Sequence, residues 1–394
     1  MKSFKPIVDR IEYGGAIIGN EERDAILKVL DSQGGKRWTI GPESEAFEKE
    51  LAKEVGVAGS VVVNSGSSAL LVAISALKLP KGSKVIIPAL NFPTAYSSLL
   101  QNGLVPVVVD CELNTLNIDA WEVDKALRQH PDVKAVIAIN IAGNCVDMEL
   151  LSQIVDDYNP NIKIILDNCD GLGGKLGGVY IEKYADVSCV SFHAAHIITM
   201  GEGGAVLSNN PDILSRARKM REWGRASGSD TLTKHAGFPP DYRERYVFDE
   251  IGYNVKPLEL QCAMGRIQLK KLNAFKKARK KNYDSLRKIF SKFPSVKLMD
   301  TTMGADPCWF SFPLLVENRP EVMAFFEANN VETRTIFSGN ILKHPAYKNT
   351  EHIQIGTLDN SNYVMEHGMF LSVHPSLTPE MLKFIEVLAK EICS

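Results

Sequence analysis

Short apolar runs that alternate with helical segments constrain the fold of this chain more than any other feature. Strand-like runs occur at residues 60–64, 84–88, 105–110, 135–141 and 163–167. Helical patterns separate them, as in the apolar segment that follows the first run. Such an alternation predicts an α/β domain with a largely parallel sheet.

Length and composition narrow the class of protein. A chain of 394 residues with 45% apolar and 23% charged residues can bury a large core and form two lobes. The net charge of -2 gives no reason to expect a nucleic acid or an acidic membrane as partner, and no apolar run is long enough to span a bilayer. Seven cysteines without paired spacing favour reduced thiols and predict a cytoplasmic protein.

Polar residues follow several of the predicted strands. Residues 65–68 (SGSS) lead from a strand into a helix, where free N–H groups form an anion site, although the same residues are ordinary helix caps. Asp167 ends an apolar strand, at the edge where parallel sheets bind ligands. It could equally cap a turn. The sequence therefore indicates a ligand site at this edge without identifying the ligand.

The segment 191–204 (SFHAAHIITMGEGG) follows another apolar strand and carries the most specific pattern in the chain. It resembles the active-site segment of the DegT/DnrJ/EryC1/StrS sugar aminotransferases, S-F-x-x-x-K-x-x-T-x-G-E-G-G, whose lysine forms a Schiff base with pyridoxal phosphate (PLP). Here His196 occupies the lysine position, and no lysine lies between Lys183 and Lys219. The resemblance extends from Trp38 to Asn340. It implies a PLP-dependent aspartate aminotransferase-like (type I) fold, with a large PLP-binding α/β domain at 1–265 and a small α+β domain at 266–394.

The resemblance also implies a set of cofactor-binding residues. Gly66 and Ser67 match the turn that holds the cofactor phosphate, and Phe92 matches the aromatic residue that stacks on the pyridine ring, although such a Phe can also be a core residue. Asp167 matches the carboxylate at the pyridine nitrogen, and Asp170 the polar residue on the hydroxyl side of the ring. The remaining matches are Ser191 and Asn254, whose family counterpart reaches the PLP phosphate of a partner subunit. A homodimer with composite active sites is therefore expected.

Three further segments of the chain resemble parts of the family that contact the substrate. The loop with Lys36, Arg37, Trp38 and Thr39 matches the family's substrate loop, but it could be a surface connection with one packed tryptophan. Lys256 replaces an arginine of many relatives, which weakens the case for a bidentate anion contact there. Glu332 and Arg334 match residues near the sugar or the amino-acid carboxylate. Without the resemblance they would be an exposed strand pair.

Histidine at the lysine position changes the expected chemistry. It cannot form the imine, but it titrates near neutrality and can act as base or acid. Within the family, this replacement marks the nucleotide-sugar 3-dehydratases, which hold pyridoxamine phosphate (PMP) non-covalently, use L-glutamate as amino donor and remove a C3 hydroxyl. The resemblance is strongest to the branch that acts on GDP-4-keto-6-deoxymannose in colitose synthesis, with a CDP-4-keto-6-deoxyglucose 3-dehydratase as the alternative. An ordinary sugar aminotransferase, a non-catalytic nucleotide-sugar binder and a degenerate family member remain open.

Some 3-dehydratases of this family carry an iron–sulfur cluster on a C-x57-C-x-C-x7-C pattern. Counted from Cys169, the later positions here are Ser227, Ser229 and Gly237, and no C-x-C occurs in the chain. Thiolates are the usual ligands of such clusters. The sequence therefore predicts an enzyme without a cluster and without another metal.

Overall fold

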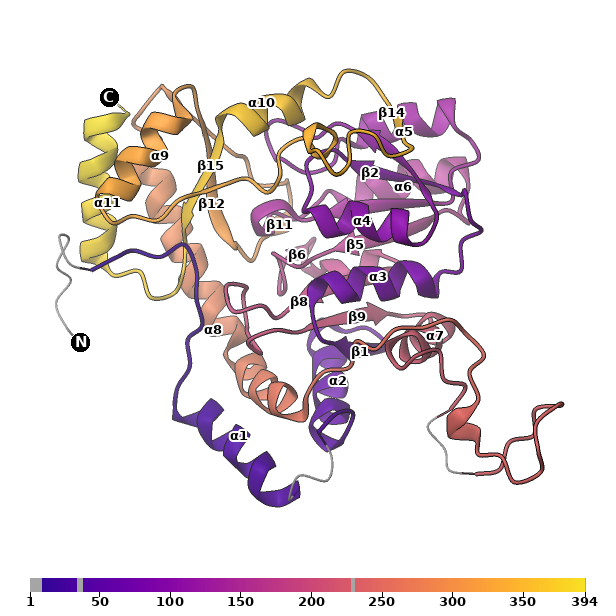
Figure 1. Cartoon of the computed structure of the whole chain (residues 1–394). Coiled ribbons are helices and arrows are strands. Elements are labelled where there is room, and N and C mark those ends of the chain that lie inside the picture. Colours follow the sequence, from indigo (N-terminus) through magenta and orange to yellow (C-terminus); the bar gives the residue numbers. More distant parts are fainter. Residues whose placement is uncertain (1–8, 34–37, 228–230, 394) are drawn as a thin grey trace.

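The computed structural model describes residues 9–33, 38–227 and 231–393. These residues form a sheet of eight strands in the order β1-β9-β8-β5-β4-β2-β3-β14 (Figure 1). The strands are β1 (Gly59–Val63), β9 (Gly204–Ser208), β8 (Val187–Ser191), β5 (Lys163–Asp167), β4 (Ala135–Ile139), β2 (Lys84–Pro88), β3 (Val105–Val109) and β14 (Ile353–Gln354). From β8 to β14 all neighbours are parallel, whereas β9 is antiparallel to both β1 and β8. The predicted α/β class with a largely parallel sheet is confirmed.

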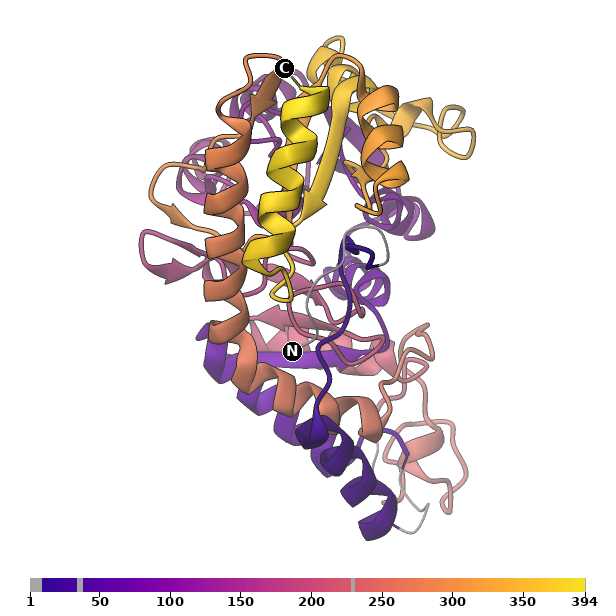
Figure 2. The same ribbon diagram turned by 90° about the vertical axis from the view of Figure 1, so that its left-hand side faces the viewer.

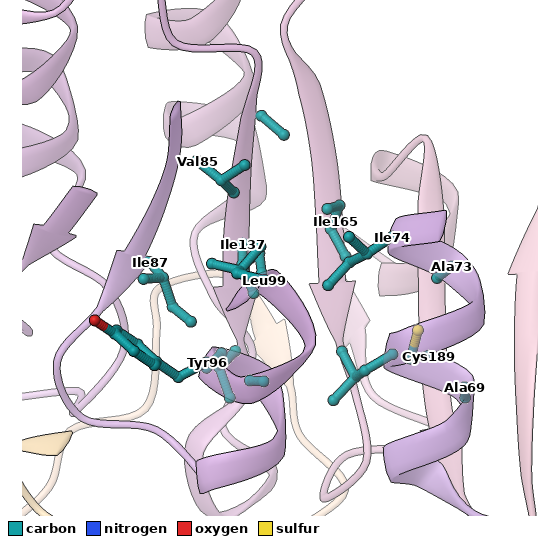
Figure 3. Packing of buried hydrophobic residues seen from close by; sticks show 14 of the residues in the cluster. Ala69, Ala73, Ile74, Val85, Ile87, Tyr96, Leu99, Ile137, Ile165 and Cys189 are labelled. Carbon is teal, nitrogen blue, oxygen red and sulfur yellow. The ribbon is translucent and has the colours of Figure 1, made fainter. Parts of the chain in front are cut away.

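Helices cover both faces of this sheet. On one face Val85, Ile87, Ile137 and Ile165 pack against α3 (Gly66–Ala76), α4 (Pro93–Gln101) and α7 (Pro211–Arg221), as Figure 3 shows for the first two helices. On the other face Ile86 packs against α5 (Ala120–Gln129) and α6 (Met148–Tyr158). Burial on both sides explains why the strands are continuous apolar runs without alternation.

A second, smaller sheet lies beside the first, in the order β10-β12-β15-β13. It comprises β10 (Val296–Leu298), β12 (Ser311–Val316), β15 (Gly368–Ser372) and β13 (Arg334–Thr335), and packs with α9 (Arg319–Ala328) and α11 (Pro379–Ile392) around a core of its own. The remaining elements are α1 (Asn20–Gln33), α2 (Pro42–Val55), α10 (Asp359–His367), the short strands β6 (Lys175–Leu176), β7 (Val179–Tyr180) and β11 (Ala305–Asp306), and the 3-10 turns η1 (Ile141–Gly143), η2 (Ile181–Tyr184), η3 (Glu244–Tyr246) and η4 (Ile341–Lys343).

The long helix α8 (Glu259–Phe290) joins the two parts of the molecule (Figure 2). Its first half packs on α1 and α2, and its second half on the core of the smaller sheet. The helix runs unbroken through position 265, where the sequence predicted the end of the first domain. In addition, β14 comes from the C-terminal part of the chain but joins the larger sheet. A domain boundary at 265 stays a prediction.

Two segments differ from what their sequence predicts. No periodic pattern persists between Arg216 and Asp249, which predicts a long irregular loop, but α7 continues to Arg221, because Ala217 and Met220 keep its apolar face in the core. The sequence of segment 330–336 predicts one strand, but only Arg334–Thr335 pairs with β15. No helix in the described part of the chain combines the length and the apolar character needed to cross a bilayer.

Candidate active site

A cavity of about 630 Å³ opens at the carboxyl ends of β5 and β8, next to the first turn of α3. Its walls bring together residues that lie far apart in the sequence. Eight of the predicted site residues line it: Gly66, Ser67, Phe92, Asp167, Asp170, Ser191, His196 and Arg334. The other seven residues therefore line the same cavity as Asp167, although they come from strand ends, helix starts and the smaller sheet.

His196 lies in a loop between β8 and β9 that is closed by hydrogen bonds to its own ends. The carbonyl of Phe192 accepts from the amide of Met200 (2.9 Å), and the amide of Phe192 donates to the carbonyl of Gly203 (2.8 Å). The Thr199 hydroxyl accepts from the amide of Gly201 (2.9 Å), where φ is +78° and glycine is favoured. The T-M-G-E-G-G sequence thus forms a fixed turn that directs His196 into the cavity.

The imidazole of His196 is held between a carboxyl group and an aromatic ring. Its Nε2 lies 3.7 Å from Oδ1 of Asp170, and its ring meets that of Phe310 edge-on at a centroid distance of 5.3 Å. Nδ1 is buried without a hydrogen-bond partner in the described chain. Burial, together with the charges of His193 and Arg279, lowers the pKa of His196 to about 3. At neutral pH the imidazole is therefore uncharged and able to accept a proton.

Two buried carboxyl groups share the turn after β5. Burial raises the pKa of Asp167, whose Oδ1 accepts one hydrogen bond from the amide of Cys169 (3.1 Å). Burial and the neighbouring Asp167 raise the pKa of Asp170 well above its usual range, and Oδ2 of Asp170 has no partner among the described residues. This unsatisfied atom, like Nδ1 of His196, marks the site as one whose polar groups are not all paired within the chain.

The first turn of α3 forms the opposite wall. The Ser65 side chain caps the helix by accepting from the amide of Ser68 (3.1 Å), and the hydroxyl of Ser67 bonds to that of Thr94 (3.1 Å). A Cβ at Gly66 would lie 2.7 Å from Cβ of Ser191, so only glycine lets the helix start approach β8 this closely. Free N–H groups and two hydroxyls at a helix start suit a phosphate.

The other predicted site residues that the structure describes lie outside the cavity lining. Lys36 and Arg37 fall outside the described residues, and Thr39 pairs with Leu258 where α2 and α8 begin, with Trp38 beside it. Asn254 accepts a hydrogen bond from Lys256 (2.5 Å), and Lys256 lies over the ring of Trp223. Glu332 is buried behind Arg334 and forms an ion pair with it. A direct substrate role for these residues is not supported by the single chain and stays a prediction.

Sequence reasoning missed several lining residues. Tyr13 reaches the cavity from the N-terminal segment, where Arg334 lies over its ring at 4.5 Å. Asn140, Phe310 and Phe370 come from elements with no local motif. His193 could have been found, because the S-F-H-A-A-H spacing places it three residues before His196, and their ring centroids are 5.6 Å apart.

Comparison with known proteins gives the same family that the residues of the cavity resemble. A model of the DegT/DnrJ/EryC1/StrS aminotransferase family matches residues 16–388. The chain belongs to this family. It departs from the family's lysine pattern at His196, in the wall of the cavity.

Several family members are similar over nearly their whole length. The lipopolysaccharide biosynthesis protein RfbH of Salmonella typhimurium is 34% identical over 98% of this chain and 92% of its own. GDP-4-keto-6-deoxy-D-mannose 3-dehydratase of Yersinia pseudotuberculosis is 31% identical over 92% of this chain and 94% of its own. A crystal structure of GDP-4-keto-6-deoxymannose-3-dehydratase with a trapped PLP-glutamate geminal diamine superimposes with a TM-score of 0.88 at 28% identity, over 96% of this chain and 99% of that one. The predicted aminotransferase-like fold is confirmed.

Proposed function

We propose that this protein is a nucleotide-sugar 3-dehydratase that works with PLP and PMP. The proposal rests on one observation above all: His196, an uncharged imidazole, occupies the family's lysine position in a cavity that otherwise keeps the family's residues. The GDP-4-keto-6-deoxy-D-mannose 3-dehydratase of Yersinia pseudotuberculosis and the 3-dehydratase structure with a trapped PLP-glutamate geminal diamine support it.

The residues present fit the cofactor. The start of α3, with Gly66 and Ser67, offers an anion site, and Phe92 is half exposed at the cavity, as a ring that stacks on a ligand must be. Asp167 is a buried carboxyl group without an ion pair in the described chain. A protonated pyridine nitrogen would supply the missing positive charge and lower the pKa of Asp167 again.

When bound, the cofactor supplies an electron sink and, as PMP, an amino group. The side chains of the protein carry out the proton transfers, and the cavity encloses the ligand. Because Nδ1 of His196 is enclosed, Nε2 is the atom that exchanges a proton with a ligand in the cavity. Asp170 holds the ring of His196 from one side and Phe310 from the other. With no lysine at this position, both cofactor forms are expected to bind non-covalently.

The proposed substrate is a GDP-linked 4-keto-6-deoxyhexose, with L-glutamate as the amino donor. The overall change replaces the C3 hydroxyl by hydrogen, so the sugar loses one oxygen, while glutamate becomes 2-oxoglutarate and ammonia. The proposed assembly is a homodimer in which Asn254 and Lys256 serve the partner's site. The proposed location is the cytoplasm, and the seven cysteines are all unpaired.

The test incubates purified protein with PLP, glutamate and GDP-4-keto-6-deoxymannose, and follows the sugar by mass spectrometry. A sugar lighter by one oxygen, with release of ammonia, is expected. Parallel reactions with the CDP- and dTDP-linked keto-sugars establish the nucleotide. No deoxygenated product with any of them would refute the proposal.

A sugar aminotransferase is the second candidate, since the same family includes transaminases. In that case the product keeps its C3 hydroxyl and gains nitrogen at C4, which the same mass spectrum distinguishes. A non-catalytic binder would retain the nucleotide sugar and give neither product.

A further inference from the structure

Arg279 is a buried cation beside the cavity that the proposed mechanism does not yet use. It projects from the middle of α8 and is 2% exposed. No carboxylate oxygen of the described chain lies within ion-pair distance of it, although Asp170 favours its charged form, and its Nε has no hydrogen-bond partner. A buried cation without an ion-paired carboxylate is costly, so its position needs a reason.

The guanidinium group binds three main-chain carbonyls that frame His196. Its Nη2 donates to the carbonyl of His196 itself (3.3 Å). Its Nη1 donates to the carbonyl of Phe310 (3.0 Å) and more weakly to that of Trp309 (3.4 Å). The ring of Phe310 in turn meets the imidazole edge-on. One planar fork therefore fixes both the base and the ring against which it packs, and lysine lacks this geometry.

The same group acts on His196 through its charge. The groups that face the imidazole are His193 from its own loop, Asp170 from the turn after β5, and Arg279 from α8. Arg279 opposes a second positive charge, and the low dielectric of a buried site strengthens this effect. Burial and Arg279 also lower the pKa of His374 to about 4, and His374 lies outside the cavity lining, where its Nε2 is 3.1 Å from the carbonyl of Gly15.

We propose that Arg279 is a positioning residue for His196: its fork holds the loop and Phe310 in place, and its charge keeps a proton off the imidazole. This role of Arg279 rests on the proposed dehydratase function, in which His196 acts as the base. His196 must be unprotonated to accept a proton from a ligand. Burial does most to keep it uncharged, His193 adds to this effect, and Arg279 contributes further without lining the cavity.

The test follows histidine ring signals by NMR from pH 8 down to about pH 2.5, or to the lowest pH at which the fold persists, in the cofactor-loaded protein, for Arg279→Met and Arg279→Lys. His196→Asn and His374→Asn assign the two signals. Arg287→Met is the matched control, because Arg287 lies two turns further along α8 and binds the carbonyl of Met299. In Arg279→Met, the pKa values of His196 and His374 are expected to rise by on the order of one pH unit. Parent and control should show no such rise.

Arg279→Lys separates charge from geometry. It is expected to keep both histidines uncharged, while kcat for the deoxy-sugar falls and KM stays near the parent value. If Arg279→Met folds and both histidines titrate as in the parent, the charge effect is refuted. If Arg279→Met does not fold, Arg279→Lys still decides: parent-like kcat would refute the positioning role. If the parent makes no deoxy-sugar, the proposed function fails, and the titrations still test Arg279.

Discussion

The side chain of His196 is 18% exposed, which lets a ligand in the cavity reach it but leaves little solvent to stabilise its charge. Lysine in the same place would tie the cofactor to the chain. Histidine leaves the amine form of the cofactor free and still offers a base. In the proposed function, this one side chain separates removal of a hydroxyl from transfer of an amino group.

Replacing His196 by lysine tests this separation. His196→Lys should form a covalent link that borohydride traps as a pyridoxyl-lysine peptide, whereas the parent should give none. Dehydration should fall by at least about 100-fold, because an amine with a pKa of about 10.4 is mostly protonated unless it is desolvated. Product mass spectra and peptide maps provide the measurements. Equal dehydration by parent and variant would mean that His196 is not the base.

A carboxyl group behind the site should make stability depend on pH. Glu182 is buried, and its Oε1 accepts from Asn168, the residue next to Asp167. Burial raises its pKa from 4.5 to about 7. The folded state thus holds this proton more tightly than the unfolded state, so stability present below pH 4.5 is lost as the pH rises through about 7.

Glu182→Gln removes this titration and keeps an oxygen for Asn168. The free energy of unfolding of the parent should fall, relative to the variant, by up to about 3 kcal/mol between pH 4.5 and 8. Urea unfolding at several pH values measures the difference. The control is Glu149→Gln, on the neighbouring surface, and a parallel pH dependence in parent and Glu182→Gln would contradict the prediction.

At the scale of elements, the site forms where β5 and β8 end and α3 begins. The start of α3 approaches both β8 and β9 so closely that glycine is needed at two points. A Cβ at Gly204 in β9 would lie 2.4 Å from the carbonyl oxygen of Ser65, and one at Gly66 would meet Ser191 and Cys169. The proposed phosphate site thus depends on how these elements pack.

Gly66→Ala should disturb that packing and weaken the binding of the cofactor. Its Cβ would lie 2.9 Å from Sγ of Cys169 as well as against Ser191, so the helix start or these two side chains must shift. We expect the dissociation constant for PLP to rise by about tenfold or more, equivalent to about 1.4 kcal/mol. Absorbance titration of the apoprotein measures it. Ser75→Ala, near the far end of α3, should bind PLP as the parent does.

Strand-end chemistry explains how much of this could be predicted from the sequence. Asp167 and the start of α3 were found because local apolar runs end just before them, whereas Ser191 and His196 were found through the resemblance to the family. The antiparallel direction of β9 was not predicted, because an apolar run carries no sign of its direction. Tyr13 was not predicted either. It reaches the cavity only because the segment around it pairs with Val331, more than three hundred residues away, and no local pattern records such a contact.

At the scale of the whole molecule, the surface around Asn254 has no function that the single chain explains. Asn254, Lys256 and Trp223 lie together away from the cavity, and Trp223 is 40% exposed with Lys256 over its ring. Asn254 belongs to a segment that resembles a phosphate-binding segment, but it does not line the cavity of its own chain. This arrangement is expected if a second copy of the chain completes each site.

Mixed dimers test whether the sites are shared. His196→Asn and Asn254→Ala should each be nearly inactive alone, the first for lack of the base and the second for weak cofactor binding. If Asn254 serves the partner's cavity, a hybrid dimer has one site with both residues intact. Refolding the two variants together at equal amounts should then restore about a quarter of the parent activity, since half of the dimers are hybrid and each has one working site. Differently tagged subunits allow the hybrids to be purified and counted. Purified hybrids that stay as inactive as the single variants would place Asn254 in its own subunit's site or outside any site.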